Sequence, residues 1–572
     1  MSQPARVTGD WLRHWAGARP DTVFLAERSG AGWREVTYAQ ALSQVANLSA
    51  ALVGRGLGPG TPILILSGNG VDHGLLTLAA QDVGIPTVPV AEQYSLIPGA
   101  QGQLAHIAAL VRPAMVFAED GAKFARGLSL PELQGLQTVV STNIPEGATP
   151  FAQLLKGDPG VDLEAARAGV GPDSVVKILM TSGSTSAPKG VETTQRMMCA
   201  NQAMIRDALP FLEQRPPRIL DWLPWNHVFG GSHNFNMMLA NGGSLYVDGG
   251  KPARGLIDLT IENSRLMNGT MAFNVPVGFA MLRDAMRADA DLRRHYFADL
   301  DMLFYAGASL PQDVWQDLHD MAVDVRGQPP LMNSSWGLTE TAPAHIVQHE
   351  LTTRSGIVGV PMTGGTVKLV PEDGDRYEVR VAGPNIFTRY HRNPEKTAEA
   401  FDEEGFFLTG DAMSFVDPAD PDKGLRFAGR ISDDFKLMTG IWVRAAQMRL
   451  DLLPRLAPLV QDVVITGEGR DQVGVLILPT PDTLARHGGG DDAGVLDAPA
   501  LAEDLRQRLA AFAADAKGSS NRIARALILS QPASIAEGEI TAKGNLNYAR
   551  IKARRAALVE RLYSGDPAVL LI

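Results

Sequence analysis

The sequence lacks several features that would place it in a specialised class of protein. Its 572 residues include one cysteine, Cys199, which excludes a disulfide framework. A single cysteine is compatible with a protein that works in a reducing compartment. The longest apolar runs, ILIL at 63–66 and VLIL at 475–478, are far shorter than a membrane-spanning helix. The opening MSQPARVTGDWLRHW has no apolar stretch after its basic residues, so we expect a soluble, cytoplasmic protein.

Positive charge is also in deficit. There are 52 Lys and Arg residues against 63 Asp and Glu residues, which gives a formal net charge of −11. The electrostatic field of a protein with this net negative charge does not attract nucleic acid or an anionic membrane, so neither is expected as a partner. Any phosphate ligand must therefore be held by a local positive site. With 45% hydrophobic and 20% charged residues, the composition is otherwise that of a large globular protein of several structural units.

Strand and helix patterns alternate along most of the chain. The pattern begins with a helix at 38–57, followed by the strand PILIL, a helix at 71–84 and the strand IPTVPV. The same alternation of strand and helix occurs again at 175–209 and 302–321. This predicts an α/β fold in which a large N-terminal lobe of helix-covered sheets precedes a small β-barrel-like unit. The short alternating segments after Pro371, YEVRVAG, GFFLTGD and LRFAGR, are typical of such a small antiparallel or barrel-like unit. A small, separate α+β domain is expected to follow, with boundaries at 1–432 and 433–572.

A hydroxyl-rich loop follows the strand predicted at 175–180. It supplies hydroxyls, a flexible glycine and one ammonium group, the groups that wrap a polyphosphate, from Thr181, Ser182, Gly183, Ser184, Thr185 and Lys189. A P-loop is excluded because here the lysine precedes the glycine. A simple polar connector is the alternative interpretation.

Two other segments place an acidic residue close to a predicted strand. NSSWGLTETAP holds Thr339 and Glu340, a hydroxyl and a carboxylate that suit Mg²⁺ and a phosphate oxygen. GFFLTGDAM isolates Asp411 in a glycine turn at the end of an apolar strand, where it can accept hydrogen bonds from a ribose diol. A solvated pair and a turn-capping aspartate are the respective alternatives.

Basic residues are prominent in two later segments. FAGRISDDFKLMTG contains Arg430, Asp433 and Lys436, and it lies between the two regions that are predicted to form separate domains. Arg430 can donate paired hydrogen bonds to phosphate or ribose oxygens. GEITAKGNLNY presents Lys543 on a loop. Surface charge without a role is the alternative for both segments.

Taken together and in this order, the five segments resemble the adenylate-forming superfamily, which includes acyl-CoA synthetases, aryl-CoA ligases, peptide-synthetase adenylation domains and firefly luciferase. The resemblance extends over nearly the whole chain. YAGASLP at 305–311 is similar to the adenine-binding turn of that family, and LPWNHVFGG with the residues up to 252 is most similar to the feruloyl-CoA synthetase branch.

The resemblance implies a role for each of these residues. The loop from Thr181 to Lys189 would hold the β- and γ-phosphates of ATP, Glu340 would bind Mg²⁺, and Thr339 would contact the α-phosphate. Asp411 would hold the ribose hydroxyls and Arg430 would add a ribose or phosphate contact. Lys543 would bridge the acid and the α-phosphate. The remaining nucleotide-binding positions would be Gly307, Ala308, Ser309 and Trp336, the last standing where tyrosine is common.

The same resemblance implies how the acid and the thiol are handled. The C-terminal domain would rotate about Asp433 between two half-reactions, and Lys436 would face the adenylate in the first orientation. His227 would line the acyl pocket and gate the thiol tunnel, with a buried structural histidine as the alternative. The pocket would be lined by Trp225, His227, Phe229, Gly307, Trp336 and Gly337, although core packing also explains each aromatic residue.

The sequence therefore predicts an enzyme that ligates a small aromatic acid, ferulate or a related hydroxycinnamate, to CoA with ATP and Mg²⁺. Alternatives are transfer of the acyl group to a carrier-protein thiol, a CoA ligase for another medium-sized acid, and a silent nucleotide-binding scaffold. The chain ends soon after Lys543, which favours a free thiol over a fused carrier domain. The oligomeric state is left open, with a homodimer as one possibility.

Overall fold

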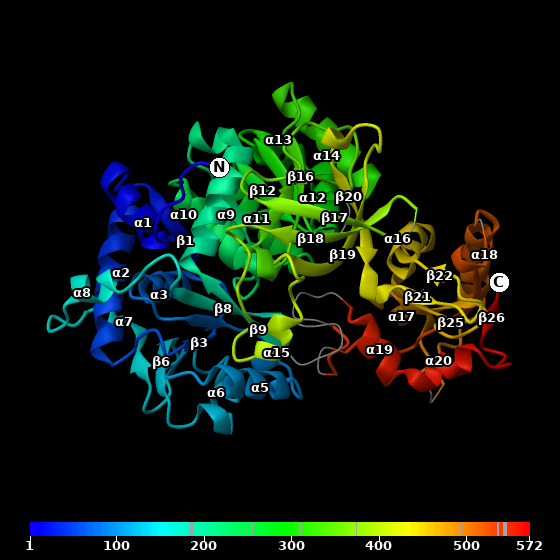
Figure 1. Ribbon diagram of the computed structural model, residues 1–572, viewed down its shortest axis with the longest axis horizontal. Coiled ribbons are helices and arrows are strands. Elements are labelled where there is room, and N and C mark those ends of the chain that lie inside the picture. The colour runs from blue at the N-terminus through cyan, green and yellow to red at the C-terminus, as the bar shows by residue number, and fades with distance from the viewer. Residues whose placement is uncertain are drawn as a thin grey trace.

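A computed structural model describes residues 1–181, 188–253, 255–307, 310–372, 374–491, 494–516, 518–534, 537–540 and 546–572. Its described strands assemble into five sheets with helices packed between and around them. Figure 1 shows the chain running from the blue and cyan N-terminal elements, through the green centre, to an orange and red C-terminal unit at one end of the long axis.

The first large sheet is parallel except for its last pair of strands, with the order β7-β6-β5-β3-β4-β8-β9. Alternate residues of β3 face opposite cores: Ile63 and Ile65 pack with α2 and α3, while Leu64 and Leu66 pack with α5. Because both of its faces are buried, β3 reads as the unbroken apolar run ILIL. The strands are β3 (Ile63–Leu66), β4 (Thr87–Pro89), β5 (Met115–Asp120), β6 (Gln137–Thr142), β7 (Thr149–Pro150), β8 (Val175–Thr181) and β9 (Lys189–Thr194).

The helices of this lobe confirm the alternating pattern predicted from the sequence. The longest, α2, begins with a capping box in which the Thr37 hydroxyl accepts from the Gln40 backbone N–H. The helices are α2 (Tyr38–Gly54), α3 (Val71–Asp82), α4 (Gln93–Leu96), α5 (Gln101–Val111), α6 (Ala125–Leu128), η1 (Pro131–Leu133), α7 (Phe151–Leu154), α8 (Leu163–Ala168), α9 (Gln195–Ala208) and η2 (Pro210–Glu213).

A smaller sheet joins the N-terminal hairpin to the middle of the chain, with the order β10-β11-β1-β2. Between β10 and β11 the chain forms a π-helix that continues directly into an α-helix. Its elements are α1 (Thr8–Ala18), β1 (Val23–Ser29), β2 (Gly32–Thr37), β10 (Arg218–Asp221), the π-helix η3 (Phe229–Asn234), α10 (Phe235–Ala240) and β11 (Ser244–Val247).

The second large sheet is mixed, with the order β12-β13-β14-β15-β16-β20-β19-β18-β17. Its first three strands are parallel and the rest are antiparallel. Its strands are β12 (Met271–Asn274), β13 (Met302–Tyr305), β14 (Leu331–Gly337), β15 (Ala344–Val347), β16 (Ile357–Pro361), β17 (Thr366–Pro371), β18 (Arg376–Ala382), β19 (Phe407–Phe415) and β20 (Leu425–Arg430).

The helices beside this sheet bury a core of their own around β13 and the fully buried Trp315. Short helices follow β14 and flank the antiparallel strands. These elements are α11 (Ile257–Leu266), α12 (Pro276–Ala288), α13 (Ala290–Phe297), α14 (Gln312–Arg326), η4 (Thr339–Thr341), α15 (Pro394–Ala398), η5 (Pro421–Lys423) and η6 (Ile431–Asp433).

The prediction of a barrel-like unit after Pro371 was wrong. The strands β18, β19 and β20 pair with one another as the alternating segments predicted, but β20 also pairs with β16. That pairing makes them the outer part of the mixed sheet, and no closed barrel forms among the described strands. A closed barrel would require β17 to pair with the edge of β20 that faces away from β19. That edge of β20 is already paired with β16, so the sheet stays open.

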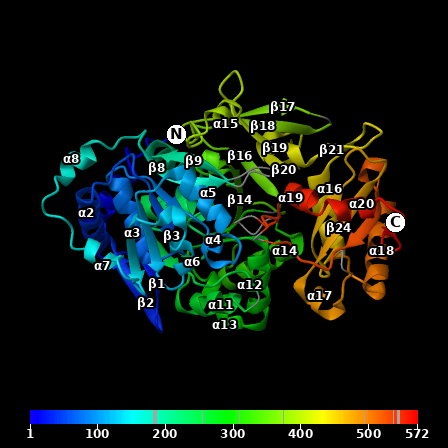
Figure 2. The same ribbon diagram turned by 90° about the horizontal axis from the view of Figure 1, so that it is seen from below.

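The C-terminal elements form a separate α+β domain, as the sequence predicts, with hydrophobic clusters that contain only its own residues. Figure 2 shows this domain set to one side in a second view as well. Its elements are β21 (Phe435–Lys436), β22 (Trp442–Val443), α16 (Ala445–Leu456), β23 (Val460–Thr466), β24 (Val473–Pro479), α17 (Pro481–His487), α18 (Pro499–Ala514), η7 (Ser519–Asn521), β25 (Ile523–Ile528), α19 (Tyr548–Arg554), α20 (Ala556–Leu562) and β26 (Leu570–Leu571).

Candidate functional site

Asp411 lies at the centre of one group of predicted site residues. Its strand partner in the register of β19 and β20 is Arg430, whose Nε is 3.2 Å from Asp411 Oδ1. The indole N–H of Trp336, on β14, donates to Asp411 Oδ2 at 2.8 Å. Three predicted nucleotide-binding residues from three strands are therefore in direct contact. Trp336 acts here through its N–H group, a role that the sequence did not predict.

The carboxyl group of Asp411 is almost fully buried, with 3% of the residue exposed. Burial raises its pKa, and the charge of Arg430 and the hydrogen bond from Trp336 oppose that rise. Within the described residues Oδ1 is buried and accepts no hydrogen bond, and the guanidinium group of Arg430 is its charge partner. The sequence placed Asp411 at a strand end. It lies instead inside β19 at an irregularity in the register, where Gly410 has a φ of +70°.

A second group contains Lys189 and Glu340. Lys189 begins β9, directly opposite Thr181 at the end of β8, and its Nζ is 4.0 Å from the centroid of the Tyr390 ring. The Tyr390 hydroxyl donates to Glu340 Oε1 at 2.9 Å. Burial lowers the pKa of Lys189, and the nearby charge of Glu340 opposes that effect. A cation, a phenol and a carboxylate thus lie in series.

The two groups meet on one segment of chain. Trp336 belongs to β14, and Thr339 and Glu340 form η4 immediately after it, with both of these residues buried. The sharp path between them requires Gly337, since a Cβ there would lie 1.9 Å from the carbonyl oxygen of Pro343. Residues 336–340 therefore join the Asp411 pair to the Lys189 group.

Tyr390 is a site residue that the sequence did not reveal. It reaches Glu340 because residues 389–391 pair with β9: Tyr390 bridges to Val191, and the His391 N–H donates to the Gly190 oxygen at 2.7 Å. A single tyrosine in a loop carries no local signal for such a contact, so only the pairing of distant segments identifies it.

The predicted pocket residues are not all placed alike. Trp225 is buried in the hydrophobic core, with its ring 5.0 Å from Phe235 and 5.1 Å from His73, so core packing accounts for it. Phe229 lies in the π-helix η3, and His227 lies two residues before that helix, its Nδ1 accepting from the Phe229 N–H at 3.3 Å. Gly307 follows β13 with a φ of +86°, which favours glycine.

Several predicted positions lie outside the described residues. These are Ser182, Gly183, Ser184 and Thr185 of the phosphate loop, Ala308 and Ser309 of the adenine turn, and Lys543 of the C-terminal domain.

The predicted hinge lies in a short connection between the two domains. Asp433 ends η6, and burial raises its pKa. The next residue, Asp434, is the one that forms buried ion pairs, with Arg376 of β18 and with Arg444, whose Nη1 is 3.2 Å away. Lys436 lies on β21 with Nζ 4.9 Å from the Trp442 ring centroid, so in this arrangement it faces its own hairpin.

Two family models match the chain. The model described as AMP-binding enzyme matches residues 12–391, and the model described as AMP-binding enzyme C-terminal domain matches residues 433–566. The chain belongs to the AMP-binding enzymes. The resemblance to that superfamily is thereby confirmed, whereas the feruloyl-CoA synthetase branch is not established.

The proteins similar to this AMP-binding enzyme have names that refer to different activities. A carboxylic acid reductase of Segniliparus rugosus is 26% identical over 69% of this chain, which spans 33% of that protein. The long-chain-fatty-acid–CoA ligase FadD15 of Mycobacterium bovis is 24% identical over 81% of this chain and 80% of the ligase. Among solved structures, the anthranilate CoA ligase AuaEII in complex with anthranoyl-AMP has a TM-score of 0.76 at 18% identity, with 98% of this chain and 99% of that one covered.

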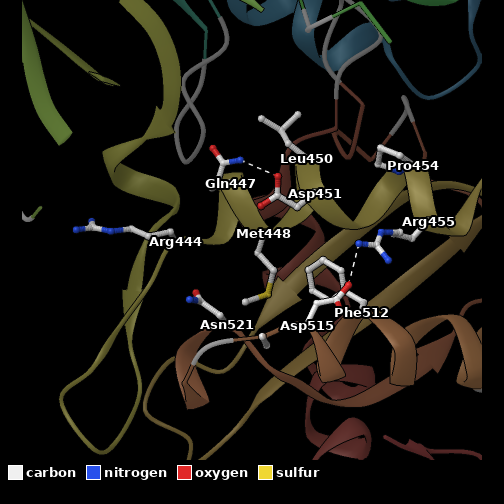
Figure 3. A pocket seen from close by; sticks show the side chains of 11 residues that line it. Arg444, Gln447, Met448, Leu450, Asp451, Pro454, Arg455, Phe512, Asp515 and Asn521 are labelled. Carbon is white, nitrogen blue, oxygen red and sulfur yellow. Dashed lines mark hydrogen bonds and ion pairs between the residues drawn. The ribbon is translucent and has the colours of Figure 1, made fainter. Parts of the chain in front are cut away.

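A cavity of about 830 Å³ lies in the C-terminal domain of this AMP-binding enzyme (Figure 3). It is bounded by α16, the end of α18 and η7, and the ion pair between Arg455 and Asp515 crosses one side of it at 3.0 Å. None of the predicted site residues lines it. In the part of the chain that the structure describes, no helix is long and apolar enough to cross a membrane.

Proposed function

We propose that this AMP-binding enzyme joins a carboxylic acid to AMP, using ATP and releasing pyrophosphate, and then transfers the acyl group to CoA. The observation that carries the proposal is the joined network in which Lys189, Tyr390 and Glu340 meet Trp336, Asp411 and Arg430 at residues 336–340. The network brings an ammonium group and two buried carboxylates into one place, and this supports the proposed roles in holding phosphate, a metal ion and a ribose.

The first step needs this arrangement because it brings like charges together. A carboxylate oxygen of the acid forms a bond to the α-phosphorus of ATP, and the bond from that phosphorus to pyrophosphate breaks. Lys189 and the loop before it hold the β- and γ-phosphates, Thr339 contacts the α-phosphate, and Asp411 with Arg430 grips the ribose. Lys543 bridges the acid and the α-phosphate, so that fixed positive charge holds both reactants in line.

Glu340 is the residue proposed to bind Mg²⁺. Its Oε1 accepts from Tyr390, and in the described part of the chain Oε2 has no hydrogen-bond partner, so one hard oxygen is available. The described residues contain no cluster of three or more His, Cys, Asp or Glu side chains that could hold a metal alone. A single carboxylate fits an ion that is carried largely by the phosphates, and such an ion supplies charge neutralisation there.

The second step uses the mixed anhydride. The CoA sulfur forms a bond to the acyl carbon, the bond to the AMP oxygen breaks, and the thiol gives up its proton. We propose that the C-terminal domain rotates about Asp433 between the steps, with Lys436 facing the adenylate in the first orientation and Lys543 leaving the site in the second. His227 lines the route taken by the thiol.

The acid is proposed to be a hydroxycinnamate such as ferulate, coumarate or caffeate. Support comes from the sequence likeness of residues 223–252 and from the aromatic rings of Phe229, Phe273 and Phe304, which lie 5.2–6.1 Å apart. Flat rings suit a planar acid. The alternatives are another medium-sized acid, a carrier-protein thiol as acceptor, and a scaffold without activity.

An ATP–pyrophosphate exchange assay with a panel of acids tests the proposal. We expect exchange with the hydroxycinnamates and much less with acetate or palmitate. Adding CoA should then yield the thioester, whereas transfer only to a supplied carrier protein would favour the alternative acceptor. Absence of exchange with every acid would leave the scaffold interpretation.

The role of Lys543 is tested by the same assay. Lys543→Ala should slow formation of acyl-AMP from ferulate by about 100-fold or more, because the like charges then meet without a bridging cation. Lys423→Ala, which removes an exposed lysine paired with Asp417, is the control. A wild-type rate in Lys543→Ala would show that the assigned role is wrong.

A further inference from the structure

The π-helix η3 is held in place by buried polar contacts from three other elements. Lys177 of β8 donates to the Gly231 oxygen at 2.6 Å, and Gln202 of α9 donates to the His233 oxygen at 3.3 Å. Asn234 donates through Nδ2 to Asp221 of β10 at 3.0 Å. The turn also packs tightly, since a Cβ at Gly231 would lie 2.1 Å from the Trp225 oxygen. π-helices are uncommon and are often found at functional sites.

These contacts determine which ring nitrogen of His233 carries the proton. Because Asn234 uses Nδ2 as a donor to Asp221, its Oδ1 faces His233 and can only accept. His233 Nδ1 lies 2.9 Å from that oxygen and is therefore the protonated nitrogen. Nε2 is left with a lone pair, and within the described ranges no group donates a hydrogen bond to it.

The ring of His233 is enclosed by aromatic side chains. Its centroid lies 5.6 Å from Phe229, 5.8 Å from Phe273 and 5.3 Å from Phe304, and the residue is 3% exposed. Burial lowers the pKa of His233 to about 4, so the ring is neutral at physiological pH. A neutral acceptor in apolar surroundings is costly unless a donor reaches it.

The location of these rings connects His233 with the acid. Phe273 and Phe304 lie on the parallel strands β12 and β13, close to their carboxyl ends, where ligands bind in open α/β sheets. Phe229, which is proposed to line the acid pocket, belongs to the same π-turn as His233. A substrate that contacts Phe229 therefore comes near the His233 ring.

We propose that His233 is a specificity-determining residue whose Nε2 accepts a hydrogen bond from a hydroxyl group of the acid substrate. Asp221 and Asn234 are positioning residues that keep the ring in the accepting tautomer. The inference rests on the proposed function, since it requires the acid to lie beside Phe229, and it assigns the substrate class as hydroxylated aromatic acids.

The test compares cinnamate with its 2-, 3- and 4-hydroxy derivatives in the wild-type enzyme and two variants. Wild type should use the best hydroxylated isomer at least tenfold better than cinnamate in kcat/KM. His233→Phe, which keeps an aromatic ring but has no acceptor, should bring that ratio close to one without changing the KM for ATP. His233→Gln, which retains an acceptor oxygen, should restore part of the preference.

A binding measurement separates this inference from the proposed function. Calorimetric titration of each acid into the enzyme should show the same tenfold preference in Kd and its loss in His233→Phe. Selective binding without pyrophosphate exchange would overturn the proposed function and support the role of His233. A preference below twofold for every hydroxylated isomer in wild type, or an equal loss for all acids in His233→Phe with unchanged thermal unfolding, would overturn the inference.

Discussion

At the scale of single residues, burial shifts the pKa values of charged groups in the proposed site and beside it. Asp411, Lys189 and Lys177 are all shifted in pKa by burial, and each is held by one or two specific neighbours. Perturbed titratable groups of this kind gather at functional sites. Each can therefore be tested by a substitution that keeps the shape of the side chain and removes its charge.

Asp411→Asn should weaken ATP binding and leave the fold intact. Asparagine preserves size but removes the carboxylate that pairs with Arg430 and accepts from Trp336. Because hydrogen bonds to a charged group contribute about 1.5–3 kcal/mol, the KM for ATP should rise about 10- to 100-fold. Steady-state kinetics with saturating acid measure this effect. Asp417→Asn, at an exposed ion pair just after the same strand, should leave the KM unchanged.

Lys177 makes stability depend on pH in an unusual direction. Burial lowers its pKa from 10.5 to about 8, so between these values the folded state binds fewer protons than the unfolded state. Stability contributed by this residue therefore rises as the pH rises from about 8 towards 10.

The wild-type protein should gain about 2 kcal/mol more in unfolding free energy than Lys177→Met across that pH range, since each unit of pKa difference corresponds to about 1.4 kcal/mol. Denaturant unfolding of both proteins at pH 8 and pH 10 measures the difference. Identical pH dependence in the two proteins would mean that Lys177 is not the group responsible.

At the scale of elements, a short connection fixes how the C-terminal domain is attached to the mixed sheet. The link from β20 through η6 to β21 is held by the ion pairs of Asp434 with Arg376 and Arg444, and Asp434 and Arg376 are both buried. Removing one partner of a buried pair leaves a charge without compensation. This link therefore attaches the C-terminal domain to the mixed sheet electrostatically as well as covalently.

Arg376→Met should lower the free energy of unfolding by about 3 kcal/mol, because the carboxylate of Asp434 stays buried with one partner fewer. The matched control is Arg380→Met on the same strand, whose ion pairs with Glu378 and Asp402 are more exposed and should be worth less than about 1 kcal/mol. Denaturant unfolding of the two variants decides between these values, and equal losses would contradict the role given to Asp434.

At the scale of the whole molecule, two domains with separate hydrophobic cores share one proposed site. Lys189, Glu340, Asp411 and Arg430 belong to the large lobe, while Lys436 and Lys543 belong to the C-terminal domain. A reaction in two steps can use this division if the connection at Asp433 allows the domains to reorient.

Asp433→Pro should impair thioester formation at least tenfold more than adenylation, because proline restricts the backbone rotation that we propose for the second step. Asp433→Ala should leave both rates close to those of the wild type. Single-turnover measurements of acyl-AMP formation and of thioester formation separate the two steps. Equal losses in both would argue against a hinge at this position.

Much of this organisation could be predicted from local patterns. The strand ending at Thr181 and the helix at Gln195–Ala208 were predicted close to their observed positions, because each depends on apolar periodicity and turn residues nearby. The barrel-like unit was wrong because the pairing of β16 with β20 joins residues far apart in the chain. Local alternation reveals a strand but not its neighbour.

The same reason separates the proposed site residues that the sequence indicated from those that it did not. Lys189, Glu340, Asp411 and Arg430 lie in recognisable segments, so the sequence by itself determined the family and the residues to expect. Tyr390, Asp434 and the series Asp221, Asn234 and His233 were decided only by the tertiary structure. Their proposed roles rest on burial and on partners from other segments, and these arise only when distant segments pack together.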